Sequence, residues 1–196
     1  MKADIDFFKI ETNNIKPRKG RILIAEPFLY DYYFKSSIVL LTEHNDKGTV
    51  GFILNKPVQA KIQDIVQDFS AGNFSVSLGG PVNTDSLHFI HTLGEQIPES
   101  IQVFDKVYWG GDFEVLKDMI ESGTVQEQQV RFFLGYSGWD PKQLERELKE
   151  NSWLVANIDS NSIMNTRHET IWRDVLGKLG PKYKMWINSP DDPSLN

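Results

Sequence analysis

Short apolar runs separated by turn-forming residues dominate the first third of the chain. The runs at residues 21–25, 36–42 and 49–54 are rich in Ile, Leu and Val, and the link at 43–48 is polar and ends in glycine. Such runs are typical of buried β-strands, and the glycine-terminated link predicts an antiparallel hairpin between the second and third runs. We expect Pro57 to close this unit, because proline cannot donate to a strand ladder.

Helical spacing of apolar residues begins after this unit and alternates irregularly with further apolar runs. The spacing and the capping patterns predict amphipathic helices over residues 61–69, 113–122, 140–150 and 166–179. The remaining apolar runs predict strands over residues 74–78, 87–91, 106–109, 130–136 and 153–158.

Three of these helices have capping residues at their predicted starts. Asp112 is placed to accept the first backbone N–H groups of the helix that follows it. Asp140 with Gln143, and Thr166 with Glu169, have the spacing of a capping box.

Strands come first and are then mixed with helices, without regular βαβ alternation. This order predicts an α+β fold with a largely antiparallel sheet. The chain has no long linker, repeat or low-complexity tract, so we expect one domain. It would span residues 18–187, between an N-terminal extension at 1–17 and a tail at 188–196 that is rich in Pro and Asp and is expected to fray.

Composition and charge narrow the possible functions. The 196 residues include 21 Lys+Arg and 27 Asp+Glu, giving a net charge of −6, and there is no Cys. The missing cysteine excludes disulfides, thiolate metal sites and a cysteine nucleophile. The negative charge argues against broad DNA binding, which needs Lys and Arg against phosphate.

Nothing in the sequence predicts a membrane or secretory location. Residues 1–14 mix charged and apolar side chains and lack the apolar core of a signal peptide. The longest aliphatic runs, at 22–25 and 38–41, are far too short to span a bilayer. We therefore expect a cytoplasmic protein with no membrane association.

The segment Gly110-Gly111-Asp112-Phe113-Glu114 nearly spells the GGDEF motif of diguanylate cyclases, but its last two letters are transposed. It also leads into a predicted helix, whereas the cyclase motif lies in a hairpin. We interpret the glycines as a tight turn and Asp112 as a helix cap. Phosphate binding at this junction is the alternative, although the Asp112 carboxylate would compete for the same amides.

The segment at 135–139 lies between a strand and a helix, the setting of a nucleophile elbow. The elbow needs G-x-S-x-G, and Trp139 stands where the last Gly belongs. With His168 and an acid, Ser137 would form the triad of a serine hydrolase. The alternative is a glycine-hinged turn that packs Tyr136 and Trp139 against the core.

The histidines and basic residues do not form a recognised site. His88 and His91 are three apart on a predicted strand, so they point to opposite faces, and no metal is expected there. The one dense basic cluster, at residues 16–21, is interpreted as a solvated arm. The last two predicted helices are separated by a strand and are not a helix-turn-helix. Neither a cofactor nor direct nucleic-acid binding is predicted.

An ordered series of short blocks is more specific than any one motif. The blocks are ILIAEP at 22–27, EH at 43–44, GFILNKP at 51–57, GGPV at 79–82, GGDF at 110–113, RFFLGYSGW at 131–139, QLE at 143–145 and SWL at 152–154. This series resembles the YqgE/AlgH family of bacterial proteins over roughly residues 18–187. The chain has Ser137 where many relatives have Ala, which argues against a family-wide serine nucleophile, and Asp140 where many have Gly.

The resemblance implies a single α+β domain whose sheet is bifurcated and barrel-like and is flanked by helices. It also implies a cytoplasmic bacterial protein, and it implies no established reaction. Members are labelled transcriptional regulators, a label that the acidic balance and the missing helix-turn-helix do not support.

The shared blocks fall mainly at predicted strand ends and turns, where binding sites tend to lie. We hypothesise that some of their residues line one pocket; the alternative is that Gly, Pro and Asn stand there because tight turns require them. The candidate binding residues are Glu43, His44, Asn55, Lys56, Gly79, Gly80, Gly110, Gly111, Asp112, Tyr136, Ser137 and Trp139.

The function that best fits these observations is a non-enzymatic, binding or regulatory role. The partner would be a protein or a small-molecule ligand, and the protein itself a monomer or a weak homo-oligomer. The alternative is an enzyme that acts on a small polar or phosphorylated substrate through Glu43, His44 and Asp112. Convergence of these three side chains in a cleft would favour the enzyme, and scattered positions would favour the binding protein.

Overall fold

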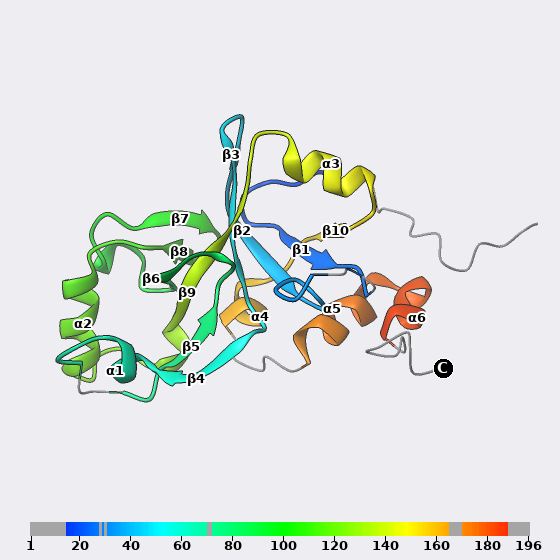
Figure 1. The fold of residues 1–196 in the computed structure, drawn as a ribbon. Helices are drawn as coiled ribbons and strands as arrows, with labels where there is room; N and C mark the ends of the chain where they lie inside the picture. Colours follow the sequence, from blue (N-terminus) through cyan, green and yellow to red (C-terminus); the bar gives the residue numbers. More distant parts are fainter. Residues whose placement is uncertain (1–14, 28, 30, 70–71, 165–169, 188–196) are drawn as a thin grey trace, which may run out of the picture.

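The computed structural model describes residues 15–27, 29, 31–69, 72–164 and 170–187. The strands are β1 (Ile22–Ala25), β2 (Ile38–Asn45), β3 (Gly48–Ile53), β4 (Pro57–Lys61), β5 (Ser75–Leu78), β6 (Val82–His91), β7 (Ile101–Phe104), β8 (Val107–Trp109), β9 (Val130–Trp139) and β10 (Trp153–Ala156). The α-helices are α1 (Ile62–Ile65), α2 (Phe113–Glu121), α3 (Gln143–Lys149), α4 (Ser160–Met164), α5 (Ile171–Leu179) and α6 (Lys184–Ile187), with 3₁₀ turns η1 (Gly94–Gln96), η2 (Glu127–Gln129) and η3 (Pro181–Tyr183) (Figure 1).

The strands form one 10-stranded sheet that branches at β9. Its main path is β10-β1-β2-β3-β9-β6-β8-β7, with antiparallel neighbours throughout. Residues 137–139 of β9 pair with β3, whereas residues 132–134 pair with β5 in parallel. On its other side, β5 pairs with β4 in antiparallel orientation. The predicted α+β fold with a mostly antiparallel, bifurcated sheet is confirmed, and the strands that the structure describes do not close into a barrel.

Glycines allow the backbones to cross closely where the sheet branches. The Gly79 N–H donates to the Leu134 carbonyl at 2.8 Å, and the Gly79 carbonyl accepts from the Ile53 N–H at 2.9 Å. A Cβ on Gly79 would lie 2.3 Å from the Gly135 carbonyl oxygen, and one on Gly80 would lie 2.3 Å from the Tyr136 carbonyl. We call Gly79, Gly80 and Gly135 the glycine crossing.

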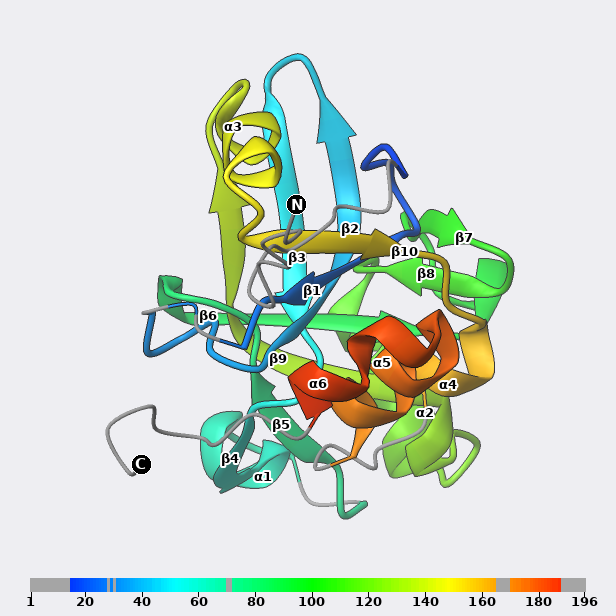
Figure 2. The same ribbon diagram turned by 90° about the vertical axis from the view of Figure 1, so that its right-hand side faces the viewer.

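Three apolar clusters stabilise the branched sheet by burying its faces under helices. The first packs β1–β3 against α4 and α5, with Phe52, Trp172 and Leu176 among its members, and Figure 2 shows these helices in front of the strands. The second lies under α1 and α2, and the third lies under α3, where Leu144 meets Trp153. In the part of the chain that the structure describes, no helix is both long and apolar enough to cross a bilayer.

Backbone conformation changes several predicted boundaries. The helix predicted over 61–69 is only α1, because Val66 is extended and Asp68 has a left-handed φ of 56°. The turn predicted at 43–48 shrinks to the hairpin tip, since β2 continues to Asn45 and β3 starts at Gly48. Pro57 begins β4 instead of closing the unit, which proline can do as a first strand residue.

The C-terminal half departs from prediction in a similar way. β9 continues to Trp139, and α3 starts at Gln143 because Lys142 has a φ of 64°; Asp140 is therefore not its N-cap, although the Gln143 side chain still accepts from the Asp140 N–H. β7, α4 and α6 were not predicted. The capping box predicted at 166–169 lies outside the described residues.

Candidate functional site

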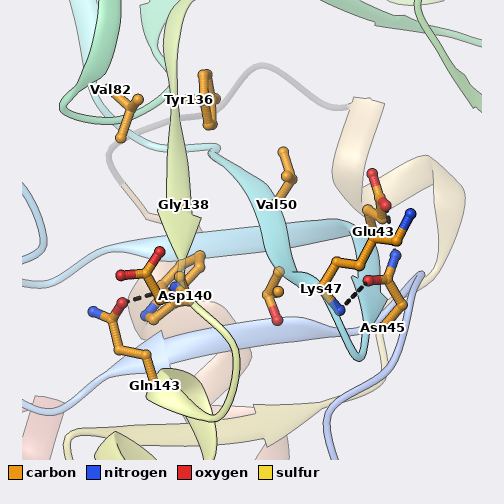
Figure 3. Close-up of a pocket in the computed structure, with 12 residues that line it drawn as sticks. Glu43, Asn45, Lys47, Val50, Val82, Tyr136, Gly138, Asp140 and Gln143 are labelled. Carbon is orange, nitrogen blue, oxygen red and sulfur yellow. Dashed lines mark hydrogen bonds between the residues drawn. The ribbon is translucent and has the colours of Figure 1, made fainter.

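A hollow of about 340 Å³ lies where the β2–β3 hairpin meets the end of β9 (Figure 3). We call it the hairpin groove. Of the predicted residues, Glu43, Tyr136 and Trp139 line it together. Its other lining residues are Asn45, Lys47, Gly48, Thr49, Val50, Val82, Gly138, Asp140 and Gln143.

The groove owes its shape to antiparallel pairing between residues 49–51 of β3 and 137–139 of β9. Figure 3 shows Glu43, Asn45 and Lys47 gathered on the hairpin, with Val50 between them and Asp140 in this view. The Asn45 amide donates to Glu43 Oε1 at 2.6 Å and accepts from the Lys47 N–H at 2.8 Å. The carboxylate of Glu43 is thus held by its own turn while the side chain stays exposed.

Trp139 is buried beneath the groove, and a hydrogen bond to Glu147 fixes the position of its indole ring. Glu147 Oε2 accepts from the indole N–H groups of Trp139 at 2.9 Å and Trp153 at 2.8 Å. Glu147 Oε1 accepts from the Gln143 amide at 2.9 Å. Sequence reasoning missed Glu147; its one signal is the i, i+4 spacing from Gln143 on a helix.

Three other predicted residues, Ser137, Asn55 and Lys56, bond to the backbone of the fold and do not line the groove. The Ser137 side chain is fully buried and donates to the Gly79 carbonyl at 3.0 Å, so the structure does not present it as a nucleophile. Asn55 bonds the Ser36 carbonyl and the Ile38 N–H, each at 2.8 Å. The Lys56 ammonium donates to the Lys35 carbonyl at 2.8 Å, and burial lowers the Lys56 pKa.

Gly110 and Gly111 line a different hollow of about 500 Å³, which we call the apolar hollow. Its other lining residues are Leu87, His88, Phe89, Glu99, Ile101, Trp109 and Phe113. Asp112 caps α2 as predicted, because its Oδ1 accepts from the Glu114 N–H at 3.0 Å and the Val115 N–H at 3.2 Å. Some of the predicted site residues therefore line the hairpin groove, others line the apolar hollow, and the rest make hydrogen bonds or close contacts that stabilise the fold.

The histidines have separate environments. His44 Nδ1 lies 2.7 Å from Thr49 Oγ1, and His88 packs its ring edge-on to Tyr136 with centroids 5.8 Å apart. Burial lowers the pKa of His88. Among the described residues, no group of three or more His, Asp or Glu side chains could hold a metal ion.

His91 is fully buried, and its hydrogen bonds fix it in the neutral form. Nδ1 accepts from the Leu93 N–H at 3.2 Å, which leaves the proton on Nε2, 3.1 Å from the Gly110 carbonyl. The ring stacks on Tyr108 with centroids 5.7 Å apart. Burial lowers the His91 pKa, and the bond to the Gly110 carbonyl opposes this effect in part.

We expect acid to destabilise the fold through His91. The pKa of His91 is lower in the folded state than in the unfolded chain, where it is about 6.5. As the pH falls below about 6.5, the unfolded chain therefore binds more protons than the folded protein does. The free energy of unfolding decreases over the range from this pH down to the pKa of the folded state. Protonation of His91 Nδ1 breaks the hydrogen bond from the Leu93 N–H, so we expect the free energy of unfolding to fall by about 1 kcal/mol. Urea unfolding at several pH values tests this. His91→Gln should reduce the pH dependence and leave the part that comes from His88, whose pKa burial also lowers, and an unchanged slope would contradict the role of His91.

Comparisons with known proteins agree on one family. The AlgH-like family profile matches residues 22–184. A UPF0301 protein of Bacteroides fragilis is 42% identical over 197 residues, covering 100% of both chains, and one of Parabacteroides distasonis is 44% identical over 97% of this chain and 98% of its own.

Solved structures share the fold. The crystal structure of a Corynebacterium diphtheriae protein superposes with a TM-score of 0.72 at 22% identity, covering 95% of this chain and 98% of the other. The solution structure of the AlgH protein from Pseudomonas aeruginosa gives a TM-score of 0.71 at 25% identity, covering 90% of this chain and 98% of the other. The resemblance predicted from the sequence blocks is confirmed, and the chain belongs to the AlgH-like family.

Proposed function

We propose that this AlgH-like protein acts by binding, and that the hairpin groove takes an extended basic segment of a partner protein. The observation that carries the proposal is that Glu43 and Asp140, from separate elements, line one hollow whose single ammonium is that of Lys47. Within this lining, carboxylates outnumber ammonium groups, and both carboxylates are exposed. A net charge of −6 would further attract a basic partner.

The groove also offers apolar surface suited to Lys and Arg side chains. Val50, Val82 and Tyr136 line the groove together with the polar residues, and all three are half-buried. Long basic side chains can lay their methylene stems on such surface, and a cation over an aromatic face gains further stabilisation. The open shape suits a chain segment better than an enclosed small molecule.

The arrangement of the alternative catalytic residues supports binding over catalysis. Glu43 lines the hairpin groove, His44 is hydrogen-bonded to Thr49, and Asp112 caps α2 beside the other hollow. These positions do not form the nucleophile–base or acid–base pair that a reaction would need. The same proposal includes the 18–187 domain as the functional unit and a cytoplasmic location.

NMR titration of the full chain tests the groove. The probe is a blocked hexapeptide that alternates Gly with Lys or Arg, and the comparison is its counterpart with Glu or Asp. We expect shifts at groove residues with the basic peptide only. The double variant Glu43→Gln/Asp140→Asn should weaken binding by about two- to thirtyfold, because each exposed charge contributes about 0.2–1 kcal/mol.

A matched control separates the groove from the net charge. Asp118→Asn/Glu121→Gln changes the charge equally on α2, where both side chains are exposed. This variant should bind the basic peptide as the unmodified protein does. Equal weakening in the two double variants, or shifts outside the groove, would overturn the proposal.

A further inference from the structure

The apolar hollow combines features of a small-molecule site that no sequence motif predicts. Its volume of about 500 Å³ is within the range of ligand pockets, which are lined mainly by apolar and aromatic side chains with few polar groups. Trp109, Phe89 and Phe113 supply aromatic walls, and Leu87 and Ile101 supply aliphatic ones. This lining matches the flat faces of an aromatic ligand.

The walls are held in place by packing that does not depend on a ligand. The Trp109 ring meets Phe52 from the core side at 5.9 Å, and Phe89 packs on Phe113 at 6.0 Å. β8 pairs Trp109 with Ile90 of β6 on one side and Ile101 of β7 on the other. A site with fixed walls loses little conformational entropy when a ligand binds.

The two glycines at the end of β8 have different roles in the hollow. Gly110 has a φ of 66°, and a Cβ built on it would meet nothing within 4 Å, so this part of the lining is open space. Gly111 is different, because a Cβ there would lie 2.7 Å from the Pro98 carbonyl oxygen. Gly111 therefore serves the packing of the turn, and Gly110 leaves room beside Trp109.

The rim of the hollow has one apolar and one charged feature. Ile101 is 49% exposed and contributes apolar surface at the rim. Glu99 is the one side chain among the described lining residues with a formal charge at neutral pH, because burial lowers the pKa of His88. Glu99 is exposed, so its carboxylate can meet a cation at the mouth of the hollow.

We infer that the apolar hollow binds a small aromatic amine, with its ring against Trp109 and Phe113 and its ammonium group at Glu99. Aromatic stacking supplies the contact inside the hollow, and the Glu99 carboxylate selects the charge of the ligand. This site is separate from the hairpin groove and does not depend on the function proposed for it.

Three probes that share one ring and differ in charge test the inference. Tryptamine, indole and indole-3-acetate are titrated into the full chain, with the Ile101 methyl and Trp109 indole signals as NMR reporters. We expect shifts centred on the hollow and affinity in the order tryptamine, indole, indole-3-acetate, with at least a fivefold difference between the first and the last. Absence of shifts at millimolar probe, or shifts centred elsewhere, would overturn it.

Variants separate the role of the ring contacts from that of the charge. Glu99→Gln should reduce the preference for tryptamine over indole-3-acetate to less than twofold while indole still binds. Glu95→Gln, a nearby exposed carboxylate outside the lining, should leave the order unchanged. If Glu99→Gln keeps the preference for tryptamine over indole-3-acetate, the role assigned to the Glu99 carboxylate is wrong.

The aliphatic rim has its own test. Ile101→Ser, at the exposed rim, should weaken all three probes severalfold without unfolding the protein, and equal binding before and after this change would contradict the inference. A blocked Gly-Trp-Lys tripeptide serves as the last probe. If it binds more tightly than tryptamine, the hollow takes a protein side chain and the small-molecule assignment is wrong.

Discussion

Gly135→Ala is expected to lower the free energy of unfolding by about 3–5 kcal/mol, because two costs combine at this position. Gly135 has a φ of 65°, where an L-residue is strained. Its new Cβ would also lie 2.7 Å from the Val82 carbonyl oxygen and 2.8 Å from that of Gly80. Both are backbone atoms, one at the glycine crossing and one in β6, so they cannot move aside without disturbing the sheet.

Gly177→Ala is the matched control, with the same added methyl group in open space. Gly177 lies inside α5, and a Cβ on it would meet nothing within 4 Å. Alanine is the better helix former, so this variant should be more stable by about 0.5–1 kcal/mol. Urea unfolding of both variants gives the comparison. A loss below about 1 kcal/mol in Gly135→Ala would mean that the crossing can relax.

Elements with strong local signals could be predicted from the sequence. The β2–β3 hairpin follows from two apolar runs and a polar link, and the start of α2 follows from the Asp112 side chain, which accepts from its first N–H groups. The end of α1 could not be predicted, because the left-handed backbone of Asp68 leaves no mark on the apolar spacing. The branching of β9 depends on pairing with β3, β5 and β6, which are distant in sequence.

The same limit applies to the candidate sites. Glu43 and Tyr136 lie in separate sequence blocks, and they share a hollow because β3 pairs with β9. Gly110 belongs to an equally distinct block, yet β8 lies beyond β6 in the sheet and places it in the other hollow. Glu99 stands in no motif, and only the fold brings it to the mouth of a hollow lined by aromatic rings.

Arg131→Met is expected to lower the free energy of unfolding by about 3 kcal/mol, since buried hydrogen bonds from a charged donor are each worth about 1.5–3 kcal/mol. The Arg131 guanidinium is buried and donates to the Ile163 carbonyl at 2.6 Å and to the Leu54 carbonyl. These bonds tie β9 to α4 and to the end of β3. Methionine fills similar volume but removes both donors.

The charge state of Arg131 makes this prediction specific. Burial lowers the Arg131 pKa to about 10, so the side chain is protonated in both the folded and the unfolded state at neutral pH. The stability difference between the unmodified protein and Arg131→Met should therefore stay constant across neutral pH. Arg146→Met removes an exposed charge on α3 and should change stability by less than about 0.5 kcal/mol. Similar unfolding curves for the two variants would show that the fold does not depend on the donors of Arg131.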